Sequence, residues 1–135
     1  MTGLDINNDA LVEISVLVTD AQLNVLGEGV DLVIKTSQEK LDGMNDFVRE
    51  MHTASGLLPE IPNGVSLEKA EEEILAYLNK YAPGAGKSPL AGNSVYVDRL
   101  FIQRDLPKVN EYLHYRTVDV SSIKELARRW YPKVY

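Results

Sequence analysis

The stretch 91-AGNSVYVDRLFIQRDLP-107 gathers a serine, a carboxylate and two arginines around a glycine-polar turn. Asp98 lies just beyond this turn, and its hard carboxylate oxygens are ligands that Mg²⁺ and Mn²⁺ prefer. A substrate would then take the remaining polar groups. The alternative is that Asp98 is an ordinary negative charge near the start of a helix, where the helix dipole favours it, with the arginines in solvent. Spacing alone favours this alternative.

A second stretch, 84-GAGKS-88, is similar to a phosphate-binding P-loop but lacks its pattern. The first glycine of G-x-x-x-x-G-K-S would have to stand at Tyr81, and the loop precedes a strand where a P-loop follows one and opens a helix. Pro89 would also block the helix start that a P-loop requires. We therefore predict that this stretch connects a helix to a strand.

Composition excludes several classes of function. The 135 residues, 44% of them hydrophobic, suit one globular domain with a packed core. The formal charge of −6 argues against a groove for long or duplex nucleic acids, but it permits a short anionic ligand held by a few local groups. No apolar run is long enough to cross a membrane, and the N-terminus has no signal-peptide pattern. The absence of cysteine excludes disulfides and fits the cytoplasm, where we expect the protein to act.

The first half of the chain predicts a hairpin followed by helices. Residues 10–20 alternate apolar side chains as a strand does, and a second strand pattern runs through 23–35 after a short polar turn. Gly27 and Gly29 interrupt this second strand and indicate a bulge or a bend. The remaining elements expected in this half are a helix over 37–51 and a loop or short helix over 52–64.

The second half predicts helices that alternate with strands. Ser66 opens the clearest helix, which has its apolar residues on one face and ends at Pro83. Ser122 and Glu125 have the spacing of a capping box for the last helix. The other expected elements are a strand over 88–94, helices from near Tyr96 and from Pro107 to 113, and a strand over 116–122. Together they predict one mixed α/β domain over residues 1–135.

Longer stretches of the chain resemble one family, oligoribonuclease, in order and over the whole length. These stretches are MTGLD, VTDAQLNVLGEG, MHTASGL, PLAGNSVYVDRLF and LHYRTVDVSSIKELARRWYP, of which the last is highly specific. Oligoribonuclease is a small 3′-to-5′ exoribonuclease of the DEDD exonuclease superfamily. The resemblance implies a ribonuclease H-like α/β fold, in which a mixed sheet with an antiparallel hairpin and parallel strands is flanked by helices.

The resemblance also implies an activity, the hydrolysis of very short oligoribonucleotides such as dinucleotides to mononucleotides. Members of the family use carboxylates to hold two divalent cations, Mg²⁺ or Mn²⁺, which activate water and stabilise the leaving oxygen. Asp98 matches the second acidic motif of the family. The resemblance therefore makes Asp98 a catalytic residue and a metal ligand.

Two apolar positions match residues that hold the bases of a bound dinucleotide. Leu4 corresponds to a leucine that wedges between the bases; without the resemblance, an ordinary apolar loop residue is the default interpretation. Phe47 occupies a position where many members place a tryptophan against a base, and an aromatic ring can still stack there. The alternative for Phe47 is a helix core residue, three positions after Met44.

Five residues match the family's cap over the 5′ phosphate of the substrate. Arg116 would offer a planar fork to phosphate oxygens, and the other members of the set would add donors. His52 and Tyr115 would reach in from the second subunit of a homodimer. For Tyr115 and Arg116 the alternative is a surface pair beside an edge strand. The cap set is His52, Ser94, Tyr115, Arg116 and Ser121.

The departures from the family pattern matter as much as the matches. The first motif, Asp-x-Glu, belongs immediately before MTGLD, and the last, a histidine followed five residues later by aspartate, belongs after RRWYP. Of the metal carboxylates only Asp98 is present, and His52 and His114 belong to other motifs. We therefore expect a fragment, truncated at both ends, of a protein of roughly 180–200 residues. Its strand edges would be exposed, and it would be inactive or nearly so.

Two interpretations from different classes remain at this point. In the first, the chain is the middle of an active oligoribonuclease that degrades short 5′-phosphorylated oligoribonucleotides. In the second, it is a non-catalytic domain that binds short RNA or dimerises. Arg128 and Arg129, beside Trp130, are interpreted as a solvated helix face with an aromatic anchor, with the phosphate region or the dimer interface as the alternative.

Overall fold

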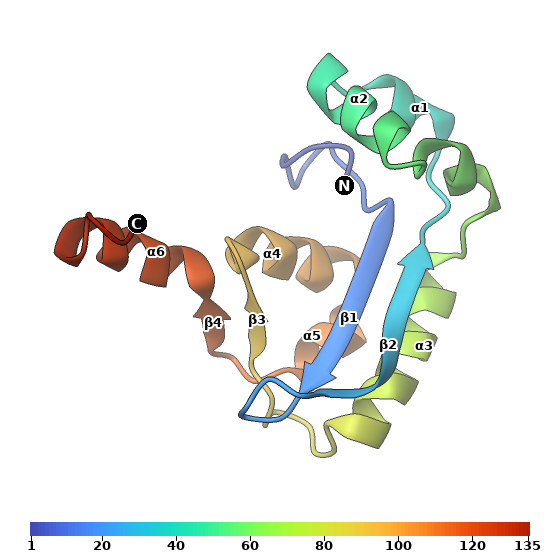
Figure 1. Cartoon of the computed structure of the whole chain (residues 1–135). Helices are drawn as coiled ribbons and strands as arrows, with labels where there is room; N and C mark the ends of the chain where they lie inside the picture. The colour runs from blue at the N-terminus through green and yellow to red at the C-terminus, as the bar shows by residue number, and fades with distance from the viewer. The chain divides into compact units, whose positions relative to one another are not determined.

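The computed structural model describes all of residues 1–135, which divide between two units, Met1–Pro83 and Gly84–Tyr135 (Figure 1). The first unit holds the hairpin and the longest helix of the chain. The second holds a pair of short parallel strands and three helices. The boundary falls at Gly84, inside the connection that the sequence predicts between a helix and a strand.

Alternating side chains build the antiparallel hairpin of β1 (Glu13–Thr19) and β2 (Val25–Val33). The register shifts between Val16 and Val18, where β2 has extra residues. Gly27 and Gly29 stand at this shift with φ of 71° and 78°, a region that residues with a Cβ rarely adopt. The bulge that these glycines predict is therefore confirmed.

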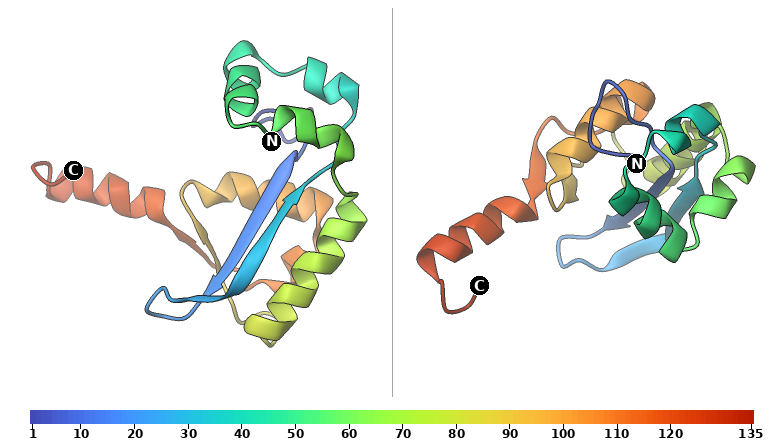
Figure 2. Two further views of the ribbon diagram at one scale, coloured as in Figure 1. Left: turned by 45° about the vertical axis from the view of Figure 1, so that its right-hand side comes forward. Right: turned by 90° about the horizontal axis from the view of Figure 1, so that it is seen from above.

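A tyrosine from the following helix completes the ladder at the bulge. The hydroxyl of Tyr77 accepts the Val18 N–H at 3.1 Å and donates to the Leu26 carbonyl. Tyr77 belongs to α3 (Leu67–Tyr81), which contacts both strands and lies along the hairpin in the left view of Figure 2. The buried residues of α3 are Ala70, Ile74, Tyr77 and Leu78, so the predicted apolar face is confirmed.

The stretch predicted as one helix over 37–51 forms two. α1 (Gln38–Asp42) ends at Gly43, and α2 (Asp46–Ala54) begins after Asn45, whose side chain accepts the Val48 N–H at 2.9 Å. Because an asparagine that caps a new helix must leave helical geometry, the single helix is broken there. The short 3₁₀ helix η1 (Leu58–Asn63) follows.

The core of the first unit lies between the start of the hairpin and these short helices. It is built from apolar side chains whose exposed fractions do not exceed 7%. α2 packs against η1, and β2 also contacts η1. The core residues are Val12, Leu41, Met44, Leu57 and Ile61.

The second unit is a parallel strand pair with its crossover. β3 (Leu90–Gly92) is followed by α4 (Val95–Asp105) and α5 (Pro107–Tyr112), and β4 (Thr117–Asp119) returns parallel to β3. Phe101 of α4 and Leu106, which lies between α4 and α5, are fully buried. The register pairs Gly92 with Asp119, so the carboxyl ends of both strands lie side by side.

The last helix, α6 (Val120–Trp130), begins earlier than predicted. Its N-cap is Asp119, whose side chain accepts the Ser121 N–H, so the capping box of Ser122 and Glu125 is wrong. Asp119 is the N-cap in place of Ser122 because it ends β4, where its carboxylate is already beside the first N–H groups of α6. α6 buries none of its residues and leaves Ile123, Leu126 and Trp130 exposed, so the predicted aromatic anchor is not found.

The α/β class with an antiparallel hairpin and parallel strands flanked by helices is confirmed. Its four strands form two separate two-stranded sheets, β1–β2 and β3–β4. No helix combines the length and apolar character that a membrane span requires.

Candidate functional site

The carboxyl ends of β3 and β4 bring the two predicted cap serines, Ser94 and Ser121, together. Ser94 follows β3 and precedes α4, while Ser121 lies in the first turn of α6. Both contact the same carboxylate oxygen, Oδ1 of Asp119, which accepts the Ser94 N–H at 2.9 Å and the Ser121 hydroxyl at 2.7 Å. Ligands bind at this end of parallel strands in many α/β proteins.

Ser94 has an unusual conformation for a helix cap. Its backbone is left-handed, with φ 55° and ψ 38°, and its hydroxyl does not cap α4. A serine at this position normally uses its hydroxyl to accept a helix N–H. Here Asp119 anchors the turn instead, and the hydroxyl of Ser94 takes no part in the cap.

The carboxylate of Asp119 is surrounded by donors. The Ser121 hydroxyl lowers the pKa of Asp119 most. Desolvation is the next largest effect and raises it, while the backbone N–H groups of Ser121, Ser94 and Val95 each lower it further. Asp119 is therefore held as an anion. Sequence reasoning missed this residue, although an aspartate two positions before a serine at a strand-to-helix junction is a known capping signal.

Asp98 lies one turn after Ser94 in α4 and is half-buried. Burial raises the pKa of its carboxyl, and the negative charge of Asp119 raises that pKa further. A cation beside Asp98 would reverse this shift. However, no group of three or more histidine, cysteine, aspartate or glutamate side chains is placed to share an ion. The donors in this chain therefore do not fit a site for two cations.

The two arginines of the opening stretch, Arg99 and Arg104, have structural partners. Arg99 donates from Nε to Asn110 Oδ1 at 2.7 Å and from Nη1 to the His114 carbonyl at 3.0 Å, which ties α4 to α5 and to the segment before β4. Arg104 pairs with Asp105 at 2.7 Å. Neither guanidinium is placed as a substrate ligand, and the solvated-arginine alternative is wrong for Arg99.

Tyr115 and Arg116 precede β4 and are exposed. The rings of His114 and Tyr115 stack with centroids 4.5 Å apart, and the Arg116 guanidinium lies 5.4 Å from the Tyr115 ring. The Arg116 N–H donates to His114 Nδ1 at 3.0 Å, and the Arg116 guanidinium makes no ion pair. Arg116 and Ser121 lie at opposite ends of β4, so no contact joins them here.

The three remaining predicted residues lie on the first unit. Leu4 and Phe47 expose 75% and 76% of their surface, so the core alternative for Phe47 is wrong. His52 is only 7% exposed, and its Nε2 lies 2.8 Å from the Met1 carbonyl oxygen. The two apolar side chains are thus presented to solvent, whereas the histidine ring is held inside its own unit.

The loop that carries Leu4 is organised by polar side chains. The carboxylate of Asp9 accepts the Thr2 hydroxyl at 2.8 Å and the Asp5 N–H at 2.9 Å. Lys40 of α1 donates to the Asn8 carbonyl at 2.6 Å, which holds the loop against the helix. Leu4 is therefore displayed by a fixed loop.

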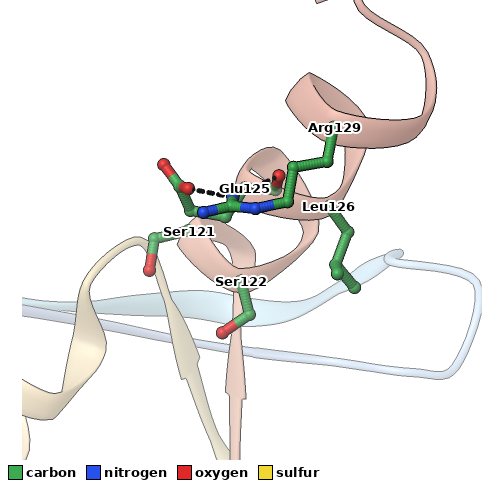
Figure 3. Close-up of a pocket in the computed structure, with 5 residues that line it drawn as sticks. All are labelled: Ser121, Ser122, Glu125, Leu126 and Arg129. Carbon is green, nitrogen blue, oxygen red and sulfur yellow. Dashed lines mark hydrogen bonds and ion pairs between the residues drawn. The ribbon is translucent and has the colours of Figure 1, made fainter.

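An open depression of about 440 Å³ lies along α6 (Figure 3). Within it the Arg129 guanidinium turns back along the helix onto Glu125. Arg128 pairs with the same carboxylate at 3.0 Å. Both arginines therefore form ion pairs with Glu125 on an exposed helix face, in agreement with the solvated face that the sequence predicts. The lining residues are Ser121, Ser122, Glu125, Leu126 and Arg129.

Comparison with known proteins places the chain in a family. A family model described as Exonuclease matches residues 1–135. The chain is 58% identical to the oligoribonuclease of Cutibacterium acnes, over all of this chain and 67% of that protein. It is 59% identical to that of Leifsonia xyli and 57% identical to that of Streptomyces coelicolor, again over all of this chain and over 65% and 68% of those proteins.

The chain thus spans about two thirds of the length of these relatives. Its match with each of them runs through the whole of both units, from the N-terminal loop to the end of α6. The resemblance that the local motifs indicate is therefore confirmed, and the chain belongs to the exonuclease family, within its oligoribonuclease group.

Proposed function

We propose that this chain forms the substrate-binding part of a 3′-to-5′ exoribonuclease that hydrolyses very short oligoribonucleotides, dinucleotides above all, to mononucleotides. The observation that carries the proposal is the convergence of Ser94 and Ser121 on Asp119 at the carboxyl ends of β3 and β4. It supports a small polar site in an otherwise acidic chain. The family and the names of the relatives support the reaction class.

Each unit has a different task in this proposal. On the second unit, Arg116 and the two serines take the 5′ phosphate, with Tyr115 beside them. On the first unit, the exposed Leu4 and Phe47 contact the bases. A ligand held by a few such contacts needs no long basic track, in keeping with the net charge of −6.

The exonuclease family is generally dependent on divalent metal ions, and Mg²⁺ or Mn²⁺ suits its carboxylate ligands. In this chain Asp98 offers one such carboxylate, and the remaining donors of a two-cation site are not among its residues. We therefore expect the 135 residues alone to bind substrate without hydrolysing it, because neither the cation ligands nor a general base is complete.

We also propose a homodimer in which Tyr115, and His52 after release from Met1, complete the cap on the neighbouring subunit. The exposure of Tyr115 supports the first of these roles. The buried position of His52 means that its role requires movement of the loop that begins at Met1. Light scattering of the chain with and without dinucleotide measures the assembly directly.

The proposal is tested by incubating the 135-residue chain with a 5′-phosphorylated diribonucleotide and Mn²⁺, and by following both binding and product. We expect binding that is lost in Arg116→Ala, with no mononucleotide released. Turnover that disappears in Asp98→Ala would show that the chain is catalytic after all. The absence of any binding would remove the support for the exoribonuclease and for the non-catalytic RNA-binding alternative alike.

A further inference from the structure

We infer that Asp119 is a positioning residue, which sets the two cap serines in place for the phosphate and does not itself touch the ligand. This inference rests on the proposed function. It begins from the register of the parallel pair, which puts Asp119 opposite Gly92 and so beside the turn that leads into α4.

One carboxylate oxygen accepts hydrogen bonds at the starts of two helices, α4 and α6. Oδ1 of Asp119 accepts the Ser121 N–H at 2.9 Å, which caps α6, and the Ser94 N–H at 2.9 Å, which lies across the strand pair before α4. Two residues that are 27 positions apart in the chain are thereby fixed to a single atom. An ordinary N-cap would hold only its own helix.

The hydrogen bond from the Ser94 N–H to Asp119 leaves the Ser94 hydroxyl free of a capping role. Because Asp119 holds the backbone of the turn, Ser94 can adopt a left-handed conformation in which its side chain does not cap α4. Such a conformation is unfavourable for a non-glycine residue, so the surroundings must hold it in place. The hydroxyl is released from capping and remains a donor for a phosphate oxygen.

The consequence for Ser121 is different. Its hydroxyl has one proton, which it donates to Asp119 at 2.7 Å. To donate to a phosphate, this hydroxyl must turn away from Asp119. The carboxylate then retains the backbone N–H groups of Ser94 and Ser121, so it is not left unpaired. Asp119 thus holds Ser121 in place before the ligand arrives.

A positioning role and a simple charge effect predict opposite changes in affinity for the dinucleotide when Asp119 is replaced. Asp119 is an anion close to the proposed phosphate site, so removing its charge should strengthen binding if charge repulsion dominates. If Asp119 positions the serines, its removal should weaken binding. Asp119→Ala removes the acceptor, while Asp119→Asn keeps one acceptor oxygen where the three hydrogen bonds converge.

The experiment measures the affinity of the full 135-residue chain for a 5′-phosphorylated diribonucleotide by calorimetry. We expect Asp119→Ala to weaken binding by about tenfold, as for the loss of one or two hydrogen bonds to the ligand, and Asp119→Asn to restore most of it. The matched control is Asp105→Asn, which removes one charge from the same unit and should leave the affinity unchanged.

A double-mutant cycle separates positioning from a loss of stability. Ser121→Ala should weaken binding in the wild-type chain but add little in Asp119→Ala, whereas the effect of Leu4→Ala should be the same in both. If Asp119→Ala does not fold, the cycle is run with Asp119→Asn, where positioning predicts a reduced but non-zero coupling to Ser121→Ala.

The outcomes are distinguishable. A folded Asp119→Ala chain that binds as tightly as wild type, or more tightly, or whose effect adds fully to that of Ser121→Ala, would overturn the positioning role and leave the proposed function intact. If only Asp119→Asn folds, tighter binding than wild type, or full additivity with Ser121→Ala, would overturn it in the same way. A wild-type chain that binds no dinucleotide would overturn the proposed function, and this inference with it.

Discussion

Two aspartates organise two different regions of this molecule. Asp9 holds the N-terminal loop of the first unit, with bonds to Thr2 and Asp5 that span at most seven residues of chain. Asp119 holds the carboxyl ends of β3 and β4 in the second unit, with a bond to Ser94 across 25 residues. The first arrangement is local, whereas the second depends on the strand pairing.

The two regions also present different chemistry. The loop around Asp9 displays Leu4, an apolar side chain that is 75% exposed. The junction around Asp119 gathers the hydroxyls of Ser94 and Ser121. A short RNA has both an apolar part, its bases, and an anionic part, its phosphates. The comparison therefore predicts that the two units supply different kinds of contact to a short RNA, and the following variants test this prediction.

The largest effect is expected from Arg116→Ala. Arg116 is the one exposed guanidinium of the predicted phosphate set, and a charge-assisted hydrogen bond contributes about 1.5–3 kcal/mol, or roughly tenfold to a hundredfold in affinity. We expect this loss for a 5′-phosphorylated dinucleotide and almost none for the same dinucleotide with a 5′ hydroxyl. Titration calorimetry with both ligands measures the difference, and an equal loss for both would place Arg116 elsewhere than at the phosphate.

A smaller effect is expected from Gly3→Ala in the first unit. A Cβ on Gly3 would lie 2.4 Å from Asp9 Oδ2, so the carboxylate must shift and its bond to Thr2 is disturbed. Because Leu4 is then displaced, we expect a loss of affinity of a few-fold to about tenfold, similar to that of Leu4→Ala. Fluorescence titration with a labelled dinucleotide measures it.

The matched control for this variant is Gly43→Ala. A Cβ on Gly43 meets only backbone oxygens at 3.6 Å, an ordinary contact, and its φ of −76° suits alanine. This control should bind as wild type. If Gly3→Ala also binds as wild type, the loop around Asp9 does not position an apolar contact, and the predicted difference between the units is wrong.

The smallest effects concern stability as a function of pH, measured by urea unfolding in the presence of a chelator. The pKa of Asp119 is lowered in the folded chain, so its contribution to stability is present above the unfolded-state value near 3.9 and is lost as the pH falls through the folded value. Asp119→Asn should therefore destabilise the chain at pH 7 and have no effect at strongly acidic pH.

Asp98 should behave in the opposite way. Its pKa is raised by burial, so the stability that it contributes is present below the unfolded-state value and is lost as the pH rises through the folded value. Asp98→Asn should raise the free energy of unfolding at pH 7 slightly, by up to about 0.5 kcal/mol. A destabilised Asp98→Asn at pH 7 would contradict the assigned burial effect.

The parts of the fold that depend on local patterns were predictable from the sequence. The apolar spacing from Ser66 to Tyr81 predicts α3, and Gly27 and Gly29 predict the bulge of the hairpin. The predicted single helix over 37–51 is wrong because Asn45 caps a second helix, α2. The helical spacing of apolar residues continues on both sides of Asn45. This spacing suits one long helix and two short helices equally, so it does not show the break.

The site was less predictable, because its geometry depends on contacts between distant segments. Motifs led to Ser94 and Ser121 separately, but their common partner Asp119 follows only from the register of β3 and β4. The sequence offers Arg99 either as a substrate contact or as a solvated charge, whereas it has a structural role, because α5 places Asn110 Oδ1 2.7 Å from its Nε. The buried position of His52 follows from its bond to Met1, which no spacing in the sequence indicates.

The most direct test compares the affinity of the unmodified chain for one diribonucleotide in two forms, with a 5′ phosphate and with a 5′ hydroxyl. If the second unit recognises the phosphate end of a short RNA, the phosphorylated form should bind at least about tenfold more tightly, as for one charge-assisted contact. Equal affinity for the two forms, or no binding of either, would contradict this account.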